Sequence, residues 1–255
     1  MQNLPRRENE TGQRVAYSGC EGEEFLVGGH RAFVILPAAT DHGALGPQRW
    51  VWYAPTLPGL PAPEENWMFQ RFLAAGLAIA GIDVGESFGS PAGRAGFTAL
   101  YEELVSKRGF APKPALLARS RGGLMLYNWA VEHPAAVACV AGIYPVCNLA
   151  SYPGLAKAGP AYGLSEAELS ANLAAHNPLE RMAPLARARV PILHLHGDQD
   201  EIVPLGQNSA ALAERYRAQG GSMELIIFSG QGHNYWPGWF QSPVLVDFVI
   251  AHAQA

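Results

Sequence analysis

The segment around Ser120 constrains the fold of this chain more than any other. An apolar run, residues 115–118, leads into Arg-Ser-Arg-Gly-Gly, and a helical pattern begins directly afterwards. This order predicts a strand, a sharp turn and a helix, with Ser120 exposed at the tip of the turn. Such a tight turn requires small residues two positions before and after the serine, and Ala118 and Gly122 meet that requirement. A serine between small residues also occurs in ordinary turns, so the assignment needs independent support.

Two later segments supply that support. Residues 190–195 form an apolar run that precedes a loop with Asp198 and Asp200, and residues 223–228 form another that precedes a glycine-rich loop with His233. Each run predicts a buried strand whose carboxyl end carries the polar residues. The chain order is therefore serine, aspartate, histidine, which differs from the order in chymotrypsin and in subtilisin.

These residue types can perform nucleophilic catalysis together. The hydroxyl of Ser120 becomes a strong nucleophile only when a base, here His233, takes its proton. A carboxylate then fixes the imidazole tautomer. The pattern His-Gly-x-x-Asp-x-x-Val-Pro, which begins at His196, favours Asp200 for this role, and we expect Asp198 to cap the turn.

The developing oxyanion requires two hydrogen-bond donors. The backbone N–H of Arg121 follows the serine and is the first predicted donor. The second is predicted in the loop after the strand 50–54, at Thr56 or Leu57. The side chain of Arg121 has two open interpretations: it turns toward the oxyanion or a substrate carboxylate, or it pairs with an acid such as Glu86. Glu86 in turn either lines the substrate pocket or is a turn residue.

Four aromatic residues follow His233 closely. Tyr235 and Trp236 are candidate substrate-binding residues at the pocket mouth, where aromatic rings suit sugars or aryl esters. For Trp239 and Phe240 we expect packing in the core beneath the last helix.

Apolar strands alternate with helical segments along the chain, which predicts an α/β fold with a doubly wound, mostly parallel sheet. We expect residues 1–23 to be an N-terminal extension and residues 24–255 to form one domain. Residues 148–188 break the alternation, and they form either a small lid over the active-site end of the sheet or an ordinary long crossover.

Charge and cysteine content restrict the ligands. The net charge is −4 without a basic run, so neither nucleic acid nor an anionic membrane is an expected partner. The three cysteines lack the spacing of a metal site, and we expect no metal and no cofactor. The polar N-terminus does not resemble a signal peptide, so we expect a cytoplasmic protein if the chain is full length and a secreted one if a leader was removed. The oligomeric state is left open.

Taken with these motifs, the chain from about Phe25 onward resembles the α/β-hydrolase superfamily. Ser120-Arg-Gly-Gly and His196-Gly-Asp-Gln-Asp are similar to the single-domain relatives of prolyl oligopeptidase and to bacterial carbohydrate esterases. The pair Ser120-Arg121 also resembles glucuronoyl esterases, but Leu124 stands where that family has a substrate-binding lysine. The resemblance implies the fold and the triad, and it leaves the substrate open.

The sequence thus predicts a serine hydrolase that cleaves short-acyl or sugar-linked carboxylic esters. One alternative is a peptidase of the prolyl-oligopeptidase type, although such enzymes usually carry a large propeller for which 255 residues leave no room. The other is a non-catalytic binding protein of the same fold.

Overall fold

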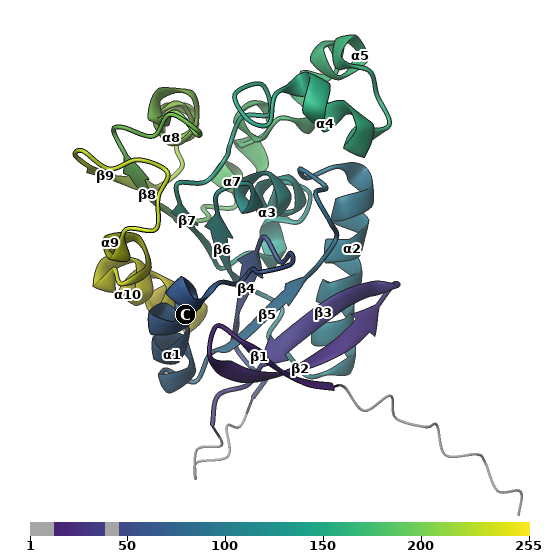
Figure 1. Ribbon diagram of the computed structural model, residues 1–255, viewed down its shortest axis with the longest axis vertical. Coiled ribbons are helices and arrows are strands. Elements are labelled where there is room, and N and C mark those ends of the chain that lie inside the picture. Colours follow the sequence, from purple (N-terminus) through teal and green to yellow (C-terminus); the bar gives the residue numbers. More distant parts are fainter. Residues whose placement is uncertain (1–12, 39–45) are drawn as a thin grey trace, which may run out of the picture.

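A nine-stranded sheet organises residues 13–38 and 46–255, which are the residues that the computed structural model describes (Figure 1). The strand order is β1-β2-β3-β5-β4-β6-β7-β8-β9. Pairing is antiparallel from β1 through β3 to β5 and parallel from β5 to β9. The predicted mostly parallel sheet is therefore confirmed. The strands are β1 (Gln13–Tyr17), β2 (Cys20–Val27), β3 (His30–Ile35), β4 (Trp50–Ala54), β5 (Ala78–Ile82), β6 (Ala115–Arg119), β7 (Cys139–Ile143), β8 (Ile192–Gly197) and β9 (Met223–Phe228).

Helices cover both faces of the sheet, so the central strands are apolar on both sides. Trp52 packs in the core formed with α2, α3 and α8, whereas its neighbour Tyr53 packs in the core formed with α1 and α10. This alternation explains why the strands read as continuous apolar runs. The helices that flank the sheet are α1 (Asn66–Ala74), α2 (Pro91–Glu102), α3 (Gly122–Ala130), α8 (Ser209–Ala218), α9 (Pro237–Phe240) and α10 (Pro243–Ala253).

The strand order reverses beside β4, and this reversal defines the site. The chain pairs β4 with β5 on one side and later with β6 on the other. In open α/β sheets, ligands bind at the carboxyl ends of the strands near such a switch point. Ser120 follows β6 directly, so it lies at that edge.

Two sequence predictions about the sheet need correction. The predicted extension, residues 1–23, contains β1 and the start of β2; β1 pairs with β2 and β2 pairs with β3, so both segments belong to the sheet. Residues 1–12 lie outside the described part. The last strand, β9, was expected to be buried but is an edge strand, and Ile227 on it is 51% exposed.

The segment 148–188 folds into short helices that pack beside α2 and α3 (Figure 1). Its apolar side chains form a small separate core with Phe88 and Leu124, and the Tyr162 hydroxyl donates to the Phe88 carbonyl over 2.8 Å. A capping box opens α5: the Ser165 hydroxyl accepts from the N–H of Glu168, and the Glu168 carboxylate accepts from the N–H of Ser165. The helices are α4 (Leu155–Tyr162), α5 (Glu166–Ala171), α6 (Leu173–His176) and α7 (Ala183–Arg187).

Three buried cysteines, Cys20, Cys139 and Cys147, are free thiols. Within the described ranges, every helix is too short or too polar to cross a membrane.

Candidate active site

Ser120 occupies the turn between β6 and α3 with a left-handed backbone, φ 48°. Its N–H donates to the Ile143 carbonyl over 3.0 Å, and its carbonyl accepts from the N–H of Val146 over 2.8 Å. These bonds hold a conformation that a residue with a side chain rarely adopts. A Cβ on Gly122 would lie 2.1 Å from the carbonyl oxygen of Ala54. The small residue after the serine is therefore required because the first turn of α3 touches the end of β4.

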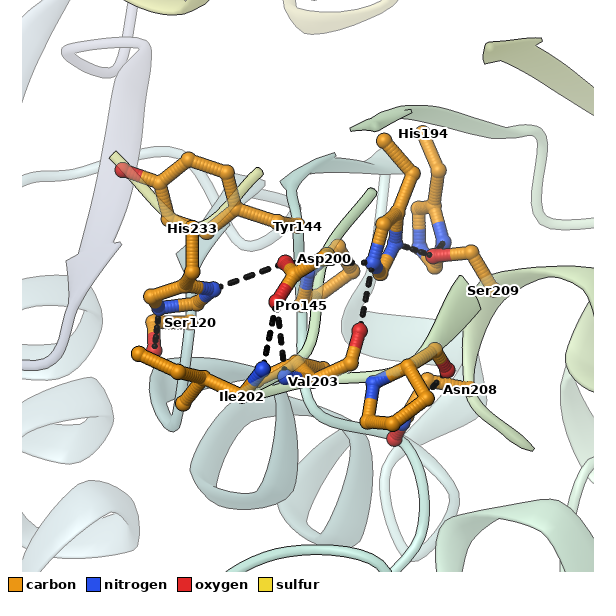
Figure 2. Close-up of polar contacts among 12 residues, drawn as sticks. Ser120, Tyr144, Pro145, His194, Asp200, Ile202, Val203, Asn208, Ser209 and His233 are labelled. Carbon is orange, nitrogen blue, oxygen red and sulfur yellow. Dashed lines mark hydrogen bonds and ion pairs between the residues drawn. The ribbon is translucent and has the colours of Figure 1, made fainter. Parts of the chain in front are cut away.

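Three side chains from three loops meet above this turn (Figure 2). The Ser120 Oγ lies 2.9 Å from Nε2 of His233, and Nδ1 of the same imidazole lies 2.8 Å from Oδ2 of Asp200. The other carboxylate oxygen, Oδ1, accepts from the backbone N–H groups of Ile202 (3.1 Å) and Val203 (2.8 Å). The imidazole is thus held between a hydroxyl and a fully buried carboxylate.

The neighbouring Asp198 lies outside this arrangement. Its carboxylate accepts from the N–H of Gly230 over 2.7 Å and from the hydroxyl of Ser229 over 3.0 Å. These contacts fix the turn that follows β9. The structure therefore brings Asp200, and not Asp198, to His233.

The Asp200 carboxyl is held in its charged form. Burial alone would raise its pKa, but hydrogen bonds from His196, His233 and the N–H of Val203 outweigh burial and hold the pKa well below its usual value. An ionised Asp200 accepts a hydrogen bond from the Nδ1–H of His233, which leaves the Nε2 lone pair directed at the serine hydroxyl.

A second histidine, His196, supports Asp200 from behind. Its Nε2 lies 2.8 Å from the carbonyl oxygen of Val203 and 3.4 Å from Oδ2 of Asp200. A carbonyl oxygen can only accept, so Nε2 must carry the proton. In the neutral imidazole the other ring nitrogen, Nδ1, accepts from the hydroxyl of Ser209 over 2.7 Å.

The hydrogen bonds continue from His196 into the core, through Ser209 and His194, which Figure 2 labels. Because Ser209 gives its proton to His196, it accepts from Nδ1 of His194 over 2.9 Å. Nε2 of His194 then accepts from the hydroxyl of Tyr127 over 2.6 Å. Burial, together with the nearby His196, lowers the pKa of His194 to about 3, so this imidazole is neutral. Each polar side chain from Tyr127 to His196 therefore has a hydrogen-bond partner.

A cavity of about 310 Å³ opens beside Ser120. One wall is the loop that follows β4, and another is the segment that follows His233. None of residues 148–188, for which the sequence left a lid and an ordinary long crossover open, is in this lining. The lining residues are Pro55, Pro58, Gly59, Leu60, Arg119, Ser120, Arg121, Tyr144, His233, Asn234 and Tyr235.

The predicted oxyanion donors differ in availability. The N–H of Leu57 already donates to the carbonyl of Leu60 over 3.3 Å. Within the described ranges, the backbone N–H groups of Thr56 and Arg121 have no such partner. Thr56 thus stays the predicted second donor, although neither Thr56 nor Leu57 is among the residues that line the cavity.

The predicted substrate-binding residues separate into two groups. Tyr235 is 61% exposed and lines the cavity. Trp236 does not line it, because its ring packs against Phe228 and Trp239 at centroid distances of 5.1 and 5.3 Å. Trp239 and Phe240 are buried in the core, as expected.

Glu86 also lies outside the cavity lining. Its carboxylate forms an ion pair with Arg121, with 2.9 Å between Oε1 and Nε. Of the two interpretations of Arg121, the structure therefore shows the pair with Glu86, although the arginine still borders the cavity.

Sequence reasoning missed Arg119, Tyr144 and Glu65. The Tyr144 ring packs on His233 at a centroid distance of 4.3 Å, and its hydroxyl donates to the carbonyl of Asn234 over 3.2 Å. Arg119 Nη1 donates to the fully buried Glu65 carboxylate over 2.6 Å. One signal was available: a charged residue that ends an otherwise apolar central strand requires a buried partner.

This fold and this arrangement of serine, histidine and aspartate define the class of α/β-hydrolases. The sequence pattern of the prolyl oligopeptidase family matches residues 97–245, more than half of the chain. The chain therefore belongs to the prolyl oligopeptidase family, a family of serine hydrolases. Among curated protein sequences there is no match.

Solved structures with the same fold include both peptidases and smaller hydrolases. A puromycin-hydrolyzing peptidase of Mycobacterium tuberculosis superposes with a TM-score of 0.70 at 17% identity, over 99% of this chain but only 43% of that one. An S-formylglutathione hydrolase of Agrobacterium tumefaciens superposes with a TM-score of 0.68 at 15% identity, over 95% of this chain and 98% of that one. Est1E of Butyrivibrio proteoclasticus gives 0.64 at 16% identity, over 96% and 100%. This chain thus spans less than half of the peptidase.

Proposed function

We propose that this chain is a carboxylic ester hydrolase in which Ser120 is the nucleophile, His233 the general base and acid, and Asp200 the orienting carboxylate. The observation that carries the proposal is the 2.9 Å contact between Ser120 Oγ and His233 Nε2 at the wall of a small cavity. A nucleophile, a base and a group that orients the base are the parts that acyl transfer requires.

The reaction begins when Ser120 Oγ attacks the ester carbonyl while His233 Nε2 takes the hydroxyl proton. Negative charge on the carbonyl oxygen is stabilised by the N–H groups of Arg121 and Thr56. The C–O bond to the alcohol then breaks, and His233 returns its proton to that alcohol. Water, activated by the same imidazole, hydrolyses the acyl-enzyme and restores Ser120.

The cavity favours short-acyl or sugar-linked esters. Its volume of about 310 Å³ lies at the lower end of the range for small-molecule sites, roughly 300–1,000 Å³. Its lining includes two arginines and two tyrosines but only one aliphatic side chain larger than proline, Leu60. Such a wall has no long apolar surface for a fatty acyl chain. The full-length likeness to an S-formylglutathione hydrolase and to Est1E also supports a compact ester hydrolase.

A peptidase is the second candidate, because the family match is to prolyl oligopeptidase and one structural relative is a puromycin-hydrolyzing peptidase. The same triad cleaves either bond, so the distinction depends on which leaving group the cavity accepts.

Two substrate series separate the candidates. We expect hydrolysis of para-nitrophenyl esters from acetate to octanoate. The kcat/KM should fall steeply for acyl chains beyond about eight carbons, because the cavity cannot bury more methylenes. Aminoacyl para-nitroanilides should be turned over only slowly. Faster turnover of the anilides would favour the peptidase, and a preference for palmitate would contradict the short-acyl proposal. Absence of both fluorophosphonate labelling of Ser120 and turnover of either series would indicate a binding protein.

A further inference from the structure

Arg119 is the last residue of β6, directly before Ser120, and it lines the same cavity. Its side chain is only 7% exposed, its Nη1 donates to Glu65 over 2.6 Å, and its guanidinium also interacts with the hydroxyls of Tyr53 and Tyr144. A guanidinium has five N–H donors. Arg119 lines the cavity, and among the described residues none of its nitrogens is buried without a hydrogen-bond partner.

The guanidinium is also held in place. Glu65, behind it, accepts from the Tyr53 hydroxyl over 2.8 Å and from the N–H of Ala62 over 2.9 Å. The rings of Tyr235 and Phe240 each lie 4.9 Å from the guanidinium carbon, measured to their centroids. A donor group fixed by a buried carboxylate and by aromatic rings is preorganised for a planar acceptor.

The charges around the cavity favour an anionic guest. Of the residues that the structure describes, two arginines, Arg119 and Arg121, line it, and no carboxylate does. Their acidic partners, Glu65 and Glu86, lie outside the lining. The Tyr144 hydroxyl adds a further polar group to the same wall.

The position of Arg119 relative to His233 indicates which half of the substrate it meets. The Tyr144 ring, which lines the cavity with Arg119, packs on the imidazole, and Tyr235, on the guanidinium, follows His233 by two residues. The imidazole that protonates the leaving alcohol must face it. Arg119 therefore lies on the leaving-group side, whereas the Arg121 and Thr56 N–H groups belong to the oxyanion side.

We infer that Arg119 is a specificity-determining residue that binds a carboxylate on the alcohol portion of the ester. The substrate class is then an acyl ester of a hydroxy acid. This inference rests on the proposed ester hydrolysis and refines it.

The first test uses the wild-type protein and a matched pair of esters, meta-acetoxybenzoate and meta-acetoxybenzamide, whose leaving groups differ mainly in charge. Hydrogen bonds from a cation to a carboxylate predict a kcat/KM about 10- to 100-fold higher for the benzoate. We expect meta-hydroxybenzoate to inhibit para-nitrophenyl acetate hydrolysis more strongly than meta-hydroxybenzamide by a similar factor. Equal values for both pairs would overturn the inference while leaving ester hydrolysis intact.

The second test uses variants. Arg119→Met alone would leave the Glu65 carboxylate buried without its partner, so it is combined with Glu65→Gln to remove both charges. This double variant should reduce the benzoate-to-benzamide ratio to near one, mainly through KM. Arg121→Met is the matched comparison, and it should change the ratio less because Glu86 already pairs with that arginine. An equal or larger loss in Arg121→Met would overturn the assignment to Arg119.

The third test separates the halves of the substrate and the two proposals. Para-nitrophenyl hemiglutarate carries its carboxylate on the acyl half, whereas the valerate ester has none. A preference for the hemiglutarate that depends on Arg119, without an Arg119-dependent preference for meta-acetoxybenzoate over meta-acetoxybenzamide, would overturn the leaving-group assignment. Calorimetric binding of meta-hydroxybenzoate to wild type and to the double variant needs no turnover. If para-nitrophenyl acetate is not hydrolysed, the proposed function fails, and binding that depends on Arg119 would still support the carboxylate site; binding equal in both proteins would overturn it.

Discussion

Replacement of Asp200 by asparagine reverses one hydrogen bond without changing the shape of the site. Oδ1 of Asp200 accepts from two backbone N–H groups, those of Ile202 and Val203. In Asp200→Asn the amide oxygen must stay on these donors, so the amide nitrogen takes the place of Oδ2, which lies 2.8 Å from His233 Nδ1. An NH2 group there donates to Nδ1, and the imidazole proton moves to Nε2.

The predicted loss follows from this tautomer. With a proton on Nε2, His233 faces the Ser120 hydroxyl, 2.9 Å away, as a donor and cannot accept the proton of the nucleophile. The same exchange of carboxylate for amide in another serine hydrolase triad lowers kcat by about 10⁴. We expect a loss of that order here, which corresponds to about 5.5 kcal/mol of transition-state stabilisation.

The assay is the kcat for para-nitrophenyl acetate in wild type, Asp200→Asn and the control Asp198→Asn. The control makes the same chemical change at an aspartate that holds only the turn at Ser229 and Gly230. We expect it to lower kcat by less than about tenfold. Retention of more than about a tenth of kcat in Asp200→Asn, or a larger loss in Asp198→Asn, would refute the reasoning.

Three further predictions concern other parts of the site. Ser120→Ala should lower kcat by several orders of magnitude and abolish fluorophosphonate labelling; a label on another serine would contradict the assignment of the nucleophile. Burial keeps His194 neutral down to about pH 3, whereas in the unfolded chain a histidine takes up a proton near pH 6.5. Acidification from about pH 6.5 toward 3 therefore favours the unfolded state. Over this range the unfolding free energy of wild type should fall more steeply than that of His194→Gln, by about 1.4 kcal/mol per pH unit. If denaturant titrations give the same dependence of unfolding free energy on pH for both proteins, His194 contributes nothing to it. Gly122→Ala should destabilise the protein by about 1–3 kcal/mol or more, because the new methyl group meets the end of β4. The control Gly206→Ala should not, because the space around Gly206 is open. Equal melting temperatures for the two variants would show that the first turn of α3 can shift.

Local patterns were sufficient to predict the sheet and the region of the site. Apolar runs that end in polar loops identified β6, β8 and β9, because the carboxyl ends of parallel strands meet at one edge. The same patterns could not show that β9 is an edge strand, since the order of strands depends on long-range pairing. Nor could they show that residues 13–23 join the sheet, because a polar strand at an edge lacks the apolar run by which the others were recognised.

Side-chain partners distant in the chain were the main omission. Arg119 and Glu65 are 54 residues apart, and their ion pair is fixed only by the packing of α1 against the sheet. Tyr235 lines the cavity, whereas its neighbour Trp236 packs against Phe228. No spacing rule could tell these two environments apart from the sequence. The sequence left two interpretations of the Arg121 side chain, and the position of Glu86 in the structure selects the ion pair between them.

The hydrogen-bond string behind Asp200 restricts how this protein can change over generations. From Tyr127 through His194 and Ser209 to His196, every proton points the same way, and the direction is set by one carbonyl group, that of Val203. A single substitution that turned an acceptor into a donor would place two donors face to face in the core. Members of the string can therefore be exchanged only in compatible sets, and we expect substitutions at these positions in related chains to occur together.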